Sequence, residues 1–431
     1  MTRLREMLAD ETVVRAFRTD ERTFTRMRKL PFERVVGLLL SGGKMSLFNR
    51  VNRFFYQLGQ LHQRPSASAF CQARRKVKPE LFTRMNEEMV ACLFEDYAKL
   101  VQRWNGRLVW AVDGTVMNLP DTPETREHYS VQINQHDEKG AVQGMASFLY
   151  DVLNEVTISV GLDAKRSEKS FVFNEHSPYF RNEAVVLYDR LYADYSVMAF
   201  HASRGEDFVI RAPLSHTFKA VVEFVRSKET DKVVTLNVSY KQSRFVQQQG
   251  LPNKIKVRLV KVMLDSGTLK VLMSSLLNGE SYPAGEFKGL YEKRWGIETY
   301  FNRLKNLLEV ERFSSNKLTG IEQDFYGIVF LATLASVLSK EEDEKAKQHS
   351  QLNGLKYSYK VNRSVCYLAL VDHVLELLLN ERKTPEQAEQ ELKMMFAGVL
   401  IPERPGRQNE RRRRLASHRL RFQRYGKRIW A

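Results

Sequence analysis

Five short apolar runs between residues 107 and 212 most constrain the fold of this chain. The runs "RLVWAVDG", "AVQGMASFLYDV", "EVTISVGLDA", "NEAVVLYDRLY" and "DFVIRA" each have the length of a buried strand, and turn signals bound several of them. "SEKSFVFNEH" and "ADYSVMAFHAS" stand between the later runs and are predicted to be helical. Three strands, a helix, a strand, a helix and a strand indicate a mixed α/β layer.

A different pattern follows between residues 213 and 280. "VVTLNVSY" and "KIKVRLVKV" alternate apolar with polar residues, and "DSG" forms a turn signal before "TLKVLM". This alternation predicts an antiparallel sheet with one basic face, formed by Lys254, Lys256 and Arg258. Because helical sequence returns from about 284 to 400, the sheet is interpreted as an insertion into the α/β layer. Residues 1–105 are predicted to be helical.

The charge of the chain indicates a polyanionic partner. The formal net charge is +17 and the pI is about 9.6, which favours nucleic acid or an anionic surface as the counterpart. The longest apolar runs, 327–338 and 368–379, fall short of the ~20 residues that a membrane span needs, so we expect core helices and no membrane partner. The three cysteines lie far apart and predict neither a disulfide framework nor a zinc site.

Basic residues are concentrated in two places. Residues 401–431 contain eleven Lys and Arg and two Glu, which predicts a tail with non-specific affinity for DNA, although a basic end without fixed structure is compatible with the same composition. A second clump suits a helix laid near phosphates, and a solvated helix face is the alternative. It consists of Arg74, Arg75, Lys76 and Lys78.

One predicted helix, 284–309, carries chemistry at its edge. An apolar stripe is accompanied by a second stripe of polar side chains at helical spacing. The alternative is an ordinary i,i+4 pair between Arg294 and Glu298, which contributes only about 0.2–0.5 kcal/mol. The second stripe consists of Tyr291, Arg294, Glu298 and Lys305.

Two aspartates follow apolar runs in the α/β layer. Asp113 ends "LVWAVD" and Asp189 ends "AVVLYD", and functional groups collect at the carboxyl ends of such strands. Asp113 could instead belong to an Asp-Gly turn, and Asp189 could cap the next helix. Together with Glu298, the two aspartates form a hard-oxygen cluster suited to Mg²⁺ or Mn²⁺. Two such ions about 3.5–4 Å apart would clamp an in-line phosphoryl transfer.

These residues resemble the DDE transposases of bacterial insertion sequences. The branch with the signature Tyr-x2-Arg-x3-Glu-x6-Lys is matched at all four positions. "AVDGTVMNLPDTPETREHY" is similar to the first-Asp segment of this family, and "YDRLYADYS" is similar to the second, where the family often has Gly in place of Leu191. "SASAFCQARRKV" resembles the N-terminal helical region, so the similarity extends from about residue 30 to the tail.

The resemblance implies an RNase H-like catalytic core, interrupted by a β-sheet insertion between the second Asp and the Glu. Helical regions would stand at both ends. The domain organisation expected from the pattern and the resemblance is 1–105, N-terminal helical DNA-binding region; 106–212, first part of the core; 213–280, insertion; 281–320, final core helix with Glu298; 321–400, C-terminal helical region; and 401–431, basic tail.

The resemblance also implies a chemistry. Asp113, Asp189 and Glu298 would bind two Mg²⁺ ions, with Mn²⁺ as a substitute, and water would cleave the transposon end. The freed 3′-OH would then attack target DNA. Phosphates near the cleaved end would be held by Tyr291, Arg294 and Lys305. The implied partner is double-stranded DNA, as terminal inverted repeats and target, bound by a homodimer assembled on DNA. A cytoplasmic, nucleoid-associated bacterial protein is expected.

Several alternatives stay open at this point. A transposase-derived DNA-binding protein without catalysis, or a structure-selective nuclease on the same fold, would share much of this sequence pattern. A hairpin intermediate is not decided either, because the insertion contains no Trp, and Phe245 or Tyr282 would have to replace it. Four histidines near the core are expected to be packing or surface residues: His128, His136, His176 and His201.

Overall fold

The computed structural model describes residues 1–25, 29–41, 45–134, 137–164, 167–214, 218–264, 267–379 and 383–404. The chain forms two compact units. Unit 1 comprises Met1–Leu100, Asn118–Gln143 and Leu304–Ala431, and unit 2 comprises Val101–Met117 and Gly144–Arg303. Each unit is therefore assembled from segments that lie far apart in the sequence.

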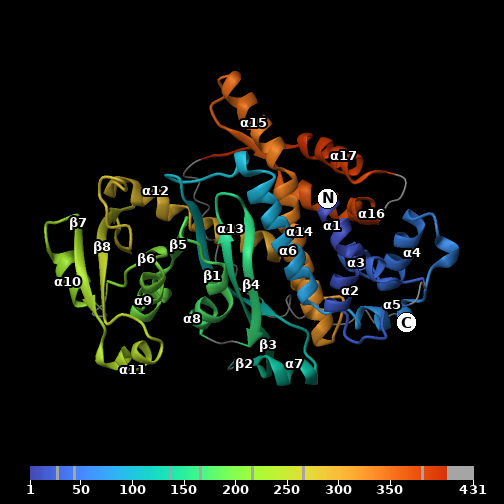
Figure 1. Cartoon of the computed structure of the whole chain (residues 1–431), viewed down its shortest axis with the longest axis horizontal. Helices are drawn as coiled ribbons and strands as arrows, with labels where there is room; N and C mark the ends of the chain where they lie inside the picture. The colour runs from blue at the N-terminus through green and yellow to red at the C-terminus, as the bar shows by residue number, and fades with distance from the viewer. Residues whose placement is uncertain are drawn as a thin grey trace. The chain divides into compact units, whose positions relative to one another are not determined.

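Unit 2 is built on a mixed sheet, which confirms the mixed α/β class expected from the apolar runs. The strands lie in the order β4-β3-β1-β5-β6-β9-β8-β7 (Figure 1). They are β1 (Leu108–Asn118), β3 (Asp137–Asp151), β4 (Val156–Ala164), β5 (Ala184–Tyr188), β6 (Asp207–Arg211), β7 (Asp231–Asn237), β8 (Lys254–Met263) and β9 (Leu269–Ser274). The first residues of β3 and the last residue of β1 belong to unit 1.

Helices and short turns connect these strands. They are α8 (Glu168–Phe171), the π-turn η3 (Val172–His176), η4 (Ser177–Tyr179), η5 (Arg190–Tyr192), α9 (Tyr195–Arg204), α10 (Lys219–Arg226), α11 (Tyr240–Gln248), η6 (Ala284–Glu286), α12 (Phe287–Glu292) and α13 (Trp295–Asn306). Helices at the predicted places after β4 and β5 confirm the interpretation of "SEKSFVFNEH" and "ADYSVMAFHAS". The last residues of α13 belong to unit 1.

The strand register fixes where the two aspartates emerge. β1 and β5 are parallel, from Leu108↔Ala184 to Val112↔Tyr188, and β5 and β6 are also parallel. All five residues of β5 are buried, as expected for an apolar strand between two parallel neighbours. Asp189 follows β5 directly. Asp113 does not end its strand, because β1 continues to Asn118, but the pairing with β5 stops one residue before it.

The strands between residues 213 and 280 extend the same sheet. β9 pairs antiparallel with β6, β8 with β9, and β7 with β8. The expected basic face is only partly present, because Lys254 and Lys256 are exposed whereas Arg258 is buried. Arg258 makes a bidentate pair with Asp231 of β7, at 2.7 and 2.5 Å. Its remaining donors are directed at the carbonyl oxygens of Leu276, Asn278 and Tyr282.

Unit 1 is mainly helical. Its N-terminal elements are α1 (Thr2–Ala9), α2 (Glu11–Phe17), α3 (Phe32–Leu40), α4 (Leu47–Gln57), η1 (Leu61–Gln63), α5 (Ala67–Arg74), α6 (Glu80–Glu95) and η2 (Ala98–Leu100). The central segment contributes α7 (Pro123–His128) and β2 (Ser130–Asn134). The C-terminal segment adds α14 (Leu318–Leu338), α15 (Lys340–Leu352), β10 (Tyr359–Val361), α16 (Arg363–Leu379), α17 (Pro385–Ala397) and β11 (Leu400–Pro402).

The longest helix, α14, forms the centre of unit 1. It packs against α6, α16 and α3, and Figure 1 shows it running beside α6. By length and composition α14 is apolar enough to cross a membrane, but 78% of its most hydrophobic window is buried inside the protein. That burial is typical of a core helix, as expected for the apolar run 327–338.

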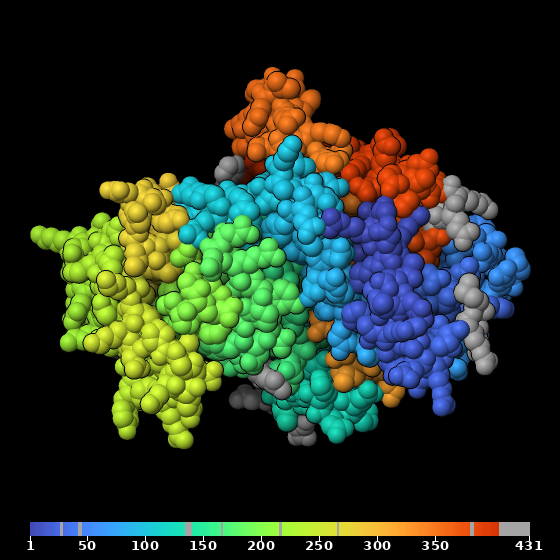
Figure 2. All heavy atoms as spheres, in the orientation of Figure 1, coloured from blue at the N-terminus to red at the C-terminus, as the bar shows by residue number. Residues whose placement is uncertain are grey.

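The end of α15 stands out from the surface of unit 1, at the top of Figure 2. Leu352, at the last position of this helix, is 87% exposed, and Leu355 in the following turn is also exposed. Behind this tip, β10 returns and pairs antiparallel with β11.

Candidate active site

Asp189 is held at the end of β5 by a local turn and a buried network. Its Oδ1 accepts a hydrogen bond from the backbone N–H of Leu191 at 2.6 Å, so Asp189 caps the short turn η5, whereas the helix that follows, α9, is capped by Asp194. Directly before it, the Tyr188 hydroxyl lies 2.7 Å from His201 Nε2, and His201 Nδ1 lies 3.1 Å from Glu206. All three network side chains are buried. The network therefore anchors the strand end from which Asp189 emerges.

Asp113 lies on β1 in a setting that disfavours its charge. Its Oδ1 accepts a hydrogen bond from the N–H of Gly114 at 2.9 Å. Burial raises the pKa of the Asp113 carboxyl to about 7, and the carboxylates of Asp189 and Glu168 also raise it, whereas Arg294 and the Gly114 N–H lower it. Asp113 and Asp189 are thus near enough to repel each other. A neighbouring cation opposes this rise in the pKa of Asp113.

Arg294 supplies such a cation and also reaches Glu298. Its Nη1 lies 3.3 Å from Asp113 Oδ2, and its Nη2 donates to Glu298 Oε1 at 2.7 Å. Arg294 is only 6% exposed, so these are partly desolvated, charge-assisted contacts. The i,i+4 ion pair between Arg294 and Glu298 therefore exists. The same arginine also contacts Asp113, which lies far away in the sequence on β1.

The segment that carries this arginine is not one continuous helix. α12 ends at Glu292 and α13 begins at Trp295. Between them, the N–H groups of Lys293 and Arg294 bond to carbonyl oxygens three residues earlier, as in a tight turn. Gly296 lies close to Val152, where an added Cβ would approach the Val152 side chain to 3.3 Å. The prediction of a single helix over 284–309 is wrong because of this turn.

The other two signature residues have different surroundings. Tyr291 is buried, and its hydroxyl donates to the carbonyl oxygen of Tyr188 at 3.2 Å, which ties α12 to β5. Burial raises the pKa of Tyr291 to about 12. Lys305 lies on α13 after Glu298, within unit 1, where its Nζ is 3.7 Å from Glu311 Oε1. The structure thus brings Tyr291, Arg294 and Glu298 together with the two aspartates in unit 2.

The donor set fits a divalent cation by chemistry but does not converge on one point. Carboxylate oxygens are the ligands that Mg²⁺ and Mn²⁺ prefer. Within the described ranges, no three His, Cys, Asp or Glu side chains are arranged so that they could hold a metal ion. Arg294 already contacts two of the expected ligands, Asp113 and Glu298. A cation would have to compete with this guanidinium or draw the carboxylates away from it.

The structure adds a carboxylate that sequence reasoning missed. Glu168 opens α8, after the predicted strand "EVTISVGLDA", and its charge acts on Asp113. Its Oε2 is enclosed and makes no hydrogen bond. The sequence feature that could have indicated Glu168 is its position shortly after the end of a strand, a feature that it shares with Asp189. A single acidic residue in a short helical segment gave no reason to prefer it.

The histidines that the structure describes are packing or surface residues, as expected. His176 is buried between Ser147 and Ser159, and burial lowers its pKa to about 3. His201 belongs to the network beneath Asp189. His128 is exposed at the end of α7 and lies edge-on to Tyr129. His136 and most of the basic tail, from residue 405, lie outside the described residues.

The two aromatics considered for a flipped base differ in exposure. Phe245 of α11 is partly exposed and contacts Phe173. Tyr282 stacks on Trp104 at 5.7 Å and accepts a hydrogen bond from Arg107 at 2.7 Å. These contacts occupy the Tyr282 ring within unit 2.

The basic clump in the N-terminal region is divided between core and surface. Ser66 caps α5 through Ala69, and α5 ends at Arg74, which is buried. Arg74 pairs with Asp324 of α14 at 2.9 Å and bonds to Gln323. Its role is therefore structural. The other three members of the clump are exposed: Arg75, Lys76 and Lys78.

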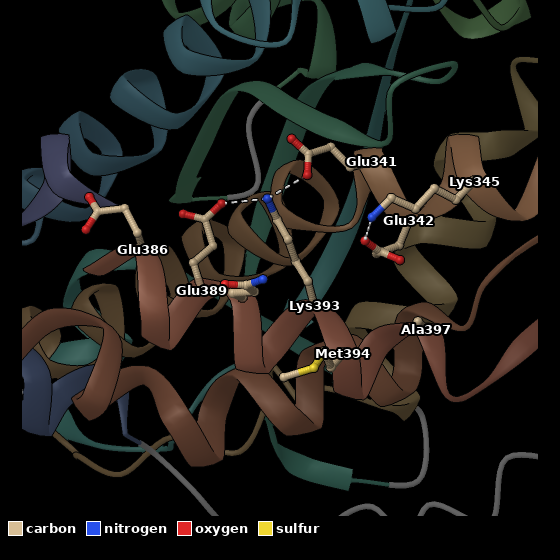
Figure 3. Close-up of a pocket in the computed structure, with 9 residues that line it drawn as sticks. Glu341, Glu342, Lys345, Glu386, Glu389, Lys393, Met394 and Ala397 are labelled. Carbon is tan, nitrogen blue, oxygen red and sulfur yellow. Dashed lines mark hydrogen bonds and ion pairs between the residues drawn. The ribbon is translucent and has the colours of Figure 1, made fainter. Parts of the chain in front are cut away.

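A pocket of about 450 Å³ opens in unit 1 between α15 and α17 (Figure 3). Four glutamates line it, which first suggests a site for a cation. Lys393 lies among them and pairs with Glu341 at 2.9 Å and Glu389 at 2.8 Å. Glu342 pairs with Lys345, and Glu386 accepts from Thr2. Since each glutamate already has a partner, the pocket does not call for an added cation.

Comparison with known proteins gives a family match and a relative that is similar in sequence. Residues 104–334, just over half of the chain, match the family described as the transposase DDE domain. The chain is 24% identical over 347 residues to the transposase InsG for insertion sequence element IS4 of Escherichia coli (strain K12), covering 78% of this chain and 75% of that protein.

A solved structure is also similar, more weakly. The cryo-EM structure of the piggyBac transposase synaptic complex with hairpin DNA has a TM-score of 0.44 and 9% identity, covering 95% of this chain and 87% of the other. A likeness of this size does not assign the fold. The family match extends over β1, β5 and α13 and includes Asp113, Asp189 and Glu298. This chain therefore belongs to the transposase DDE domain family.

Proposed function

We propose that this transposase cleaves transposon ends at terminal inverted repeats and joins the freed 3′-OH to target DNA. Asp113, Asp189 and Glu298 are the proposed catalytic carboxylates. One observation carries this proposal: Arg294 bridges Asp113 and Glu298, so a strand and a helix that are far apart in the sequence deliver their acidic groups to one place in unit 2. The mutual repulsion of Asp113 and Asp189 supports Asp189 as the third catalytic carboxylate.

The strand order supports an RNase H-like core. In order of appearance within unit 2, the first five strands are β1, β3, β4, β5 and β6, and in the sheet they lie in the order 3-2-1-4-5. The fourth, β5, is parallel to the first, β1, and the fifth, β6, is parallel to β5. Both proposed aspartates emerge where the β1–β5 pairing ends. In open α/β sheets, ligands bind beyond the carboxyl ends of the parallel strands. The arrangement therefore offers its carboxylates to a substrate at that edge.

The proposed ligands for two Mg²⁺ ions, with Mn²⁺ as a substitute, are Asp113, Asp189 and Glu298. Bound there, the ions would supply Lewis-acid stabilisation of the charge that develops during phosphoryl transfer. The chain itself orients the carboxylates. The Gly114 N–H fixes Asp113, the Leu191 N–H fixes Asp189, and Arg294 fixes Glu298.

Arg294 has a second proposed role, at the phosphate backbone of the DNA. Its guanidinium can exchange a carboxylate for a phosphate, because both offer two oxygens to its planar fork. Lys305 would add a point charge, and Tyr291 would support the strand end that carries Asp189 through its bond to Tyr188. The proposed partners are double-stranded terminal repeats and target DNA, bound by a homodimer assembled on DNA.

A cleavage-and-joining assay tests this function. Purified protein is incubated with Mg²⁺, a plasmid target and a labelled duplex carrying the inverted repeat that flanks the gene. Glu298→Gln, which keeps the side-chain shape and removes the charge, is the matched variant. We expect the native protein to nick at the repeat boundary and join the 3′ end, and the variant only to bind.

The other outcomes separate the alternatives. If both proteins bind and neither cuts in Mg²⁺ or Mn²⁺, the chain is a DNA-binding protein without catalysis. If the native protein cuts branched DNA and never joins ends, it is a structure-selective nuclease. A hairpin on cleaved ends in a denaturing gel would reveal the route of second-strand cleavage.

A further inference from the structure

Glu168 lies against the strand that carries Asp113. Its carboxyl carbon is 3.0 Å from the position that a Cβ on Gly114 would occupy, and its Cγ is 3.1 Å from the same point. Because Gly114 has no side chain, the carboxyl group rests on the backbone of β1, one residue after Asp113. Any larger residue at position 114 would push Glu168 away from the two aspartates.

Within the part of the chain that the structure describes, this carboxylate has no cation paired with it. Glu168 Oε2 is enclosed without a hydrogen bond, and Glu168 makes no ion pair with any residue that the structure describes. Its chain neighbour Lys169 is already paired with Asp194 at 2.7 Å. Burial raises the pKa of Glu168, the Tyr192 hydroxyl lowers it, and the charge of Asp189 raises it. A partly desolvated carboxylate beside like charges is costly unless a cation joins it.

Tyr192 provides an independent sign of an incomplete site. Its side chain is 0% exposed, and its hydroxyl interacts with the Glu168 carboxylate without reaching ordinary hydrogen-bond geometry. Burial raises the pKa of this hydroxyl, and the charges of Glu168, Asp113 and Asp189 raise it as well. The hydroxyl therefore lies among the three carboxylates. A buried polar group without a well-formed hydrogen bond is unusual in a folded protein and calls for an explanation.

Among the described residues, the carboxylates of this region are only partly paired with cations. Four carboxylates act on one another or share a partner: Asp113, Asp189, Glu168 and Glu298. Arg294 contacts two of them, Asp113 and Glu298. Asp189 and Glu168 make no ion pair within the described ranges. The carboxylates that Arg294 does not contact are therefore those of Asp189 and Glu168.

We propose that Glu168 is a fourth carboxylate of the divalent-cation site, acting beside Asp113 and Asp189, either on the ion directly or through a bound water. The inference rests on the proposed function, because it takes the cation from the two-metal chemistry proposed there. It adds a ligand that the three-carboxylate signature does not contain. It also gives the Tyr192 hydroxyl a role, which is to orient the Glu168 carboxylate directly or through a water between them.

Metal binding by the full-length protein tests the inference without relying on activity. Mn²⁺ is titrated calorimetrically into the native protein, Glu168→Gln and Asp113→Asn at one pH. The matched control is Glu175→Gln, since Glu175 lies in the helical segment that follows Glu168 but is not among the charges that shift the pKa of Asp113. We expect Glu168→Gln to weaken Mn²⁺ binding by about 10- to 100-fold, and Glu175→Gln to leave it unchanged.

Thermal unfolding separates this role from a merely structural one. Without divalent ions, Glu168→Gln should melt at or above the native temperature, because it removes repulsion. With Mn²⁺, the native protein should gain more than the variant. A structural hydrogen-bonding role would instead lower the melting temperature of the variant under both conditions, and that result would overturn the inference.

The titrations also distinguish the two proposals. If Asp113→Asn loses Mn²⁺ binding while Glu168→Gln binds like the native protein, Glu168 is not a ligand and the proposed function stands. If the native protein binds no Mn²⁺, with or without terminal-repeat DNA, the two-metal chemistry is wrong and the role of Glu168 is rejected with it.

Discussion

At the scale of single residues, Arg294 is the group on which the site depends most. A buried or half-buried carboxylate remains ionised only if a cation or several hydrogen-bond donors face it. Arg294 faces two such carboxylates, from β1 and from α13, and therefore fixes their separation. Arg294 is therefore the cation that pairs with the carboxylates of the site, and it is also the proposed ligand of a DNA phosphate.

Replacing Arg294 by Gln should reveal this competition. At neutral pH we expect a loss of about 1–3 kcal/mol of stability, below the ~3–5 kcal/mol of a fully buried pair because Glu298 is partly exposed. Mg²⁺ should stabilise the variant more than the native protein, since its carboxylates have lost their cation. Urea unfolding with and without Mg²⁺ measures both effects.

Arg303→Gln is the control for that experiment, because Arg303 is on the same helix and pairs with Glu155 instead. It should respond to Mg²⁺ as the native protein does. Equal stabilisation of all three proteins by Mg²⁺ would show that Arg294 and the ion do not share ligands.

His176 predicts a pH dependence of stability. Burial lowers its pKa to about 3 in the folded chain, against about 6.5 when unfolded. Between these values only the unfolded chain binds the proton, so this contribution is complete above about pH 6.5 and declines as the pH falls. At pH 5 the loss is about 2 kcal/mol. His176→Asn should be less stable than the native protein at pH 7.5, with a smaller difference at pH 5.

Unfolding midpoints from pH 7.5 to pH 5 measure this effect. His128→Asn, at an exposed position, should follow the native curve throughout. Parallel curves for native protein and His176→Asn would contradict the prediction, because they would mean that His176 titrates normally in the folded chain.

At this scale the sequence predicted some site residues and missed others. The spacing of Tyr291, Arg294 and Glu298 is local and could be read directly. The bridge from Arg294 to Asp113 supports placing that aspartate near the same helix. Glu168 could not be found, because its relevance arises from Gly114 and Tyr192, which are neighbours in space only.

At the scale of elements, alternating patterns predicted the strands β7 and β8 correctly. The same patterns wrongly predicted that Arg258 lies on an exposed basic face. The alternation in β8 placed Arg258 beside Lys254 and Lys256, but alternation does not reveal which strand covers that face. β7 and the segment after β9 enclose Arg258 and supply its acceptors. Similarly, the break between α12 and α13 follows from a tight turn that helical periodicity does not register.

The buried Arg258 predicts a stability effect in this part of the sheet. Asp231→Asn would leave the guanidinium without its charged partner, and we expect a loss on the order of 3 kcal/mol. Lys256→Gln, at an exposed position of the same strand, should stay within about 0.5 kcal/mol of the native protein. Equilibrium urea unfolding checks both. A small effect of Asp231→Asn would mean that the carbonyl acceptors alone satisfy Arg258.

At the scale of the whole molecule, the sequence predicted the α/β class because its strands are apolar and turn signals bound several of them. It did not reveal that unit 1 draws on three segments, including 118–143 from between two strands. Such an assembly depends on contacts between distant residues, and no local pattern encodes it. The basic charge, by contrast, is a property of the whole chain and needs no fold to be read.

Deleting residues 405–431 tests what that charge does. The deleted stretch is strongly basic, so binding to DNA should weaken and its dependence on salt should become shallower, by about 0.9 in the logarithmic slope for each phosphate that the tail neutralises. Fluorescence anisotropy over a series of salt concentrations gives the slope. An unchanged slope would remove the tail from the DNA-binding surface.

The interleaving of the two units has a consequence for the protein during its synthesis. A ribosome completes every residue of unit 2 before it reaches α14, the central helix of unit 1. Until then, α3 and α6 have emerged without the helix that covers their apolar faces. A truncated messenger RNA, or translation that stops before residue 318, would therefore release chains whose first hundred residues expose apolar surface. Such fragments should be removed by proteases or aggregate, so that only finished chains accumulate in the cell.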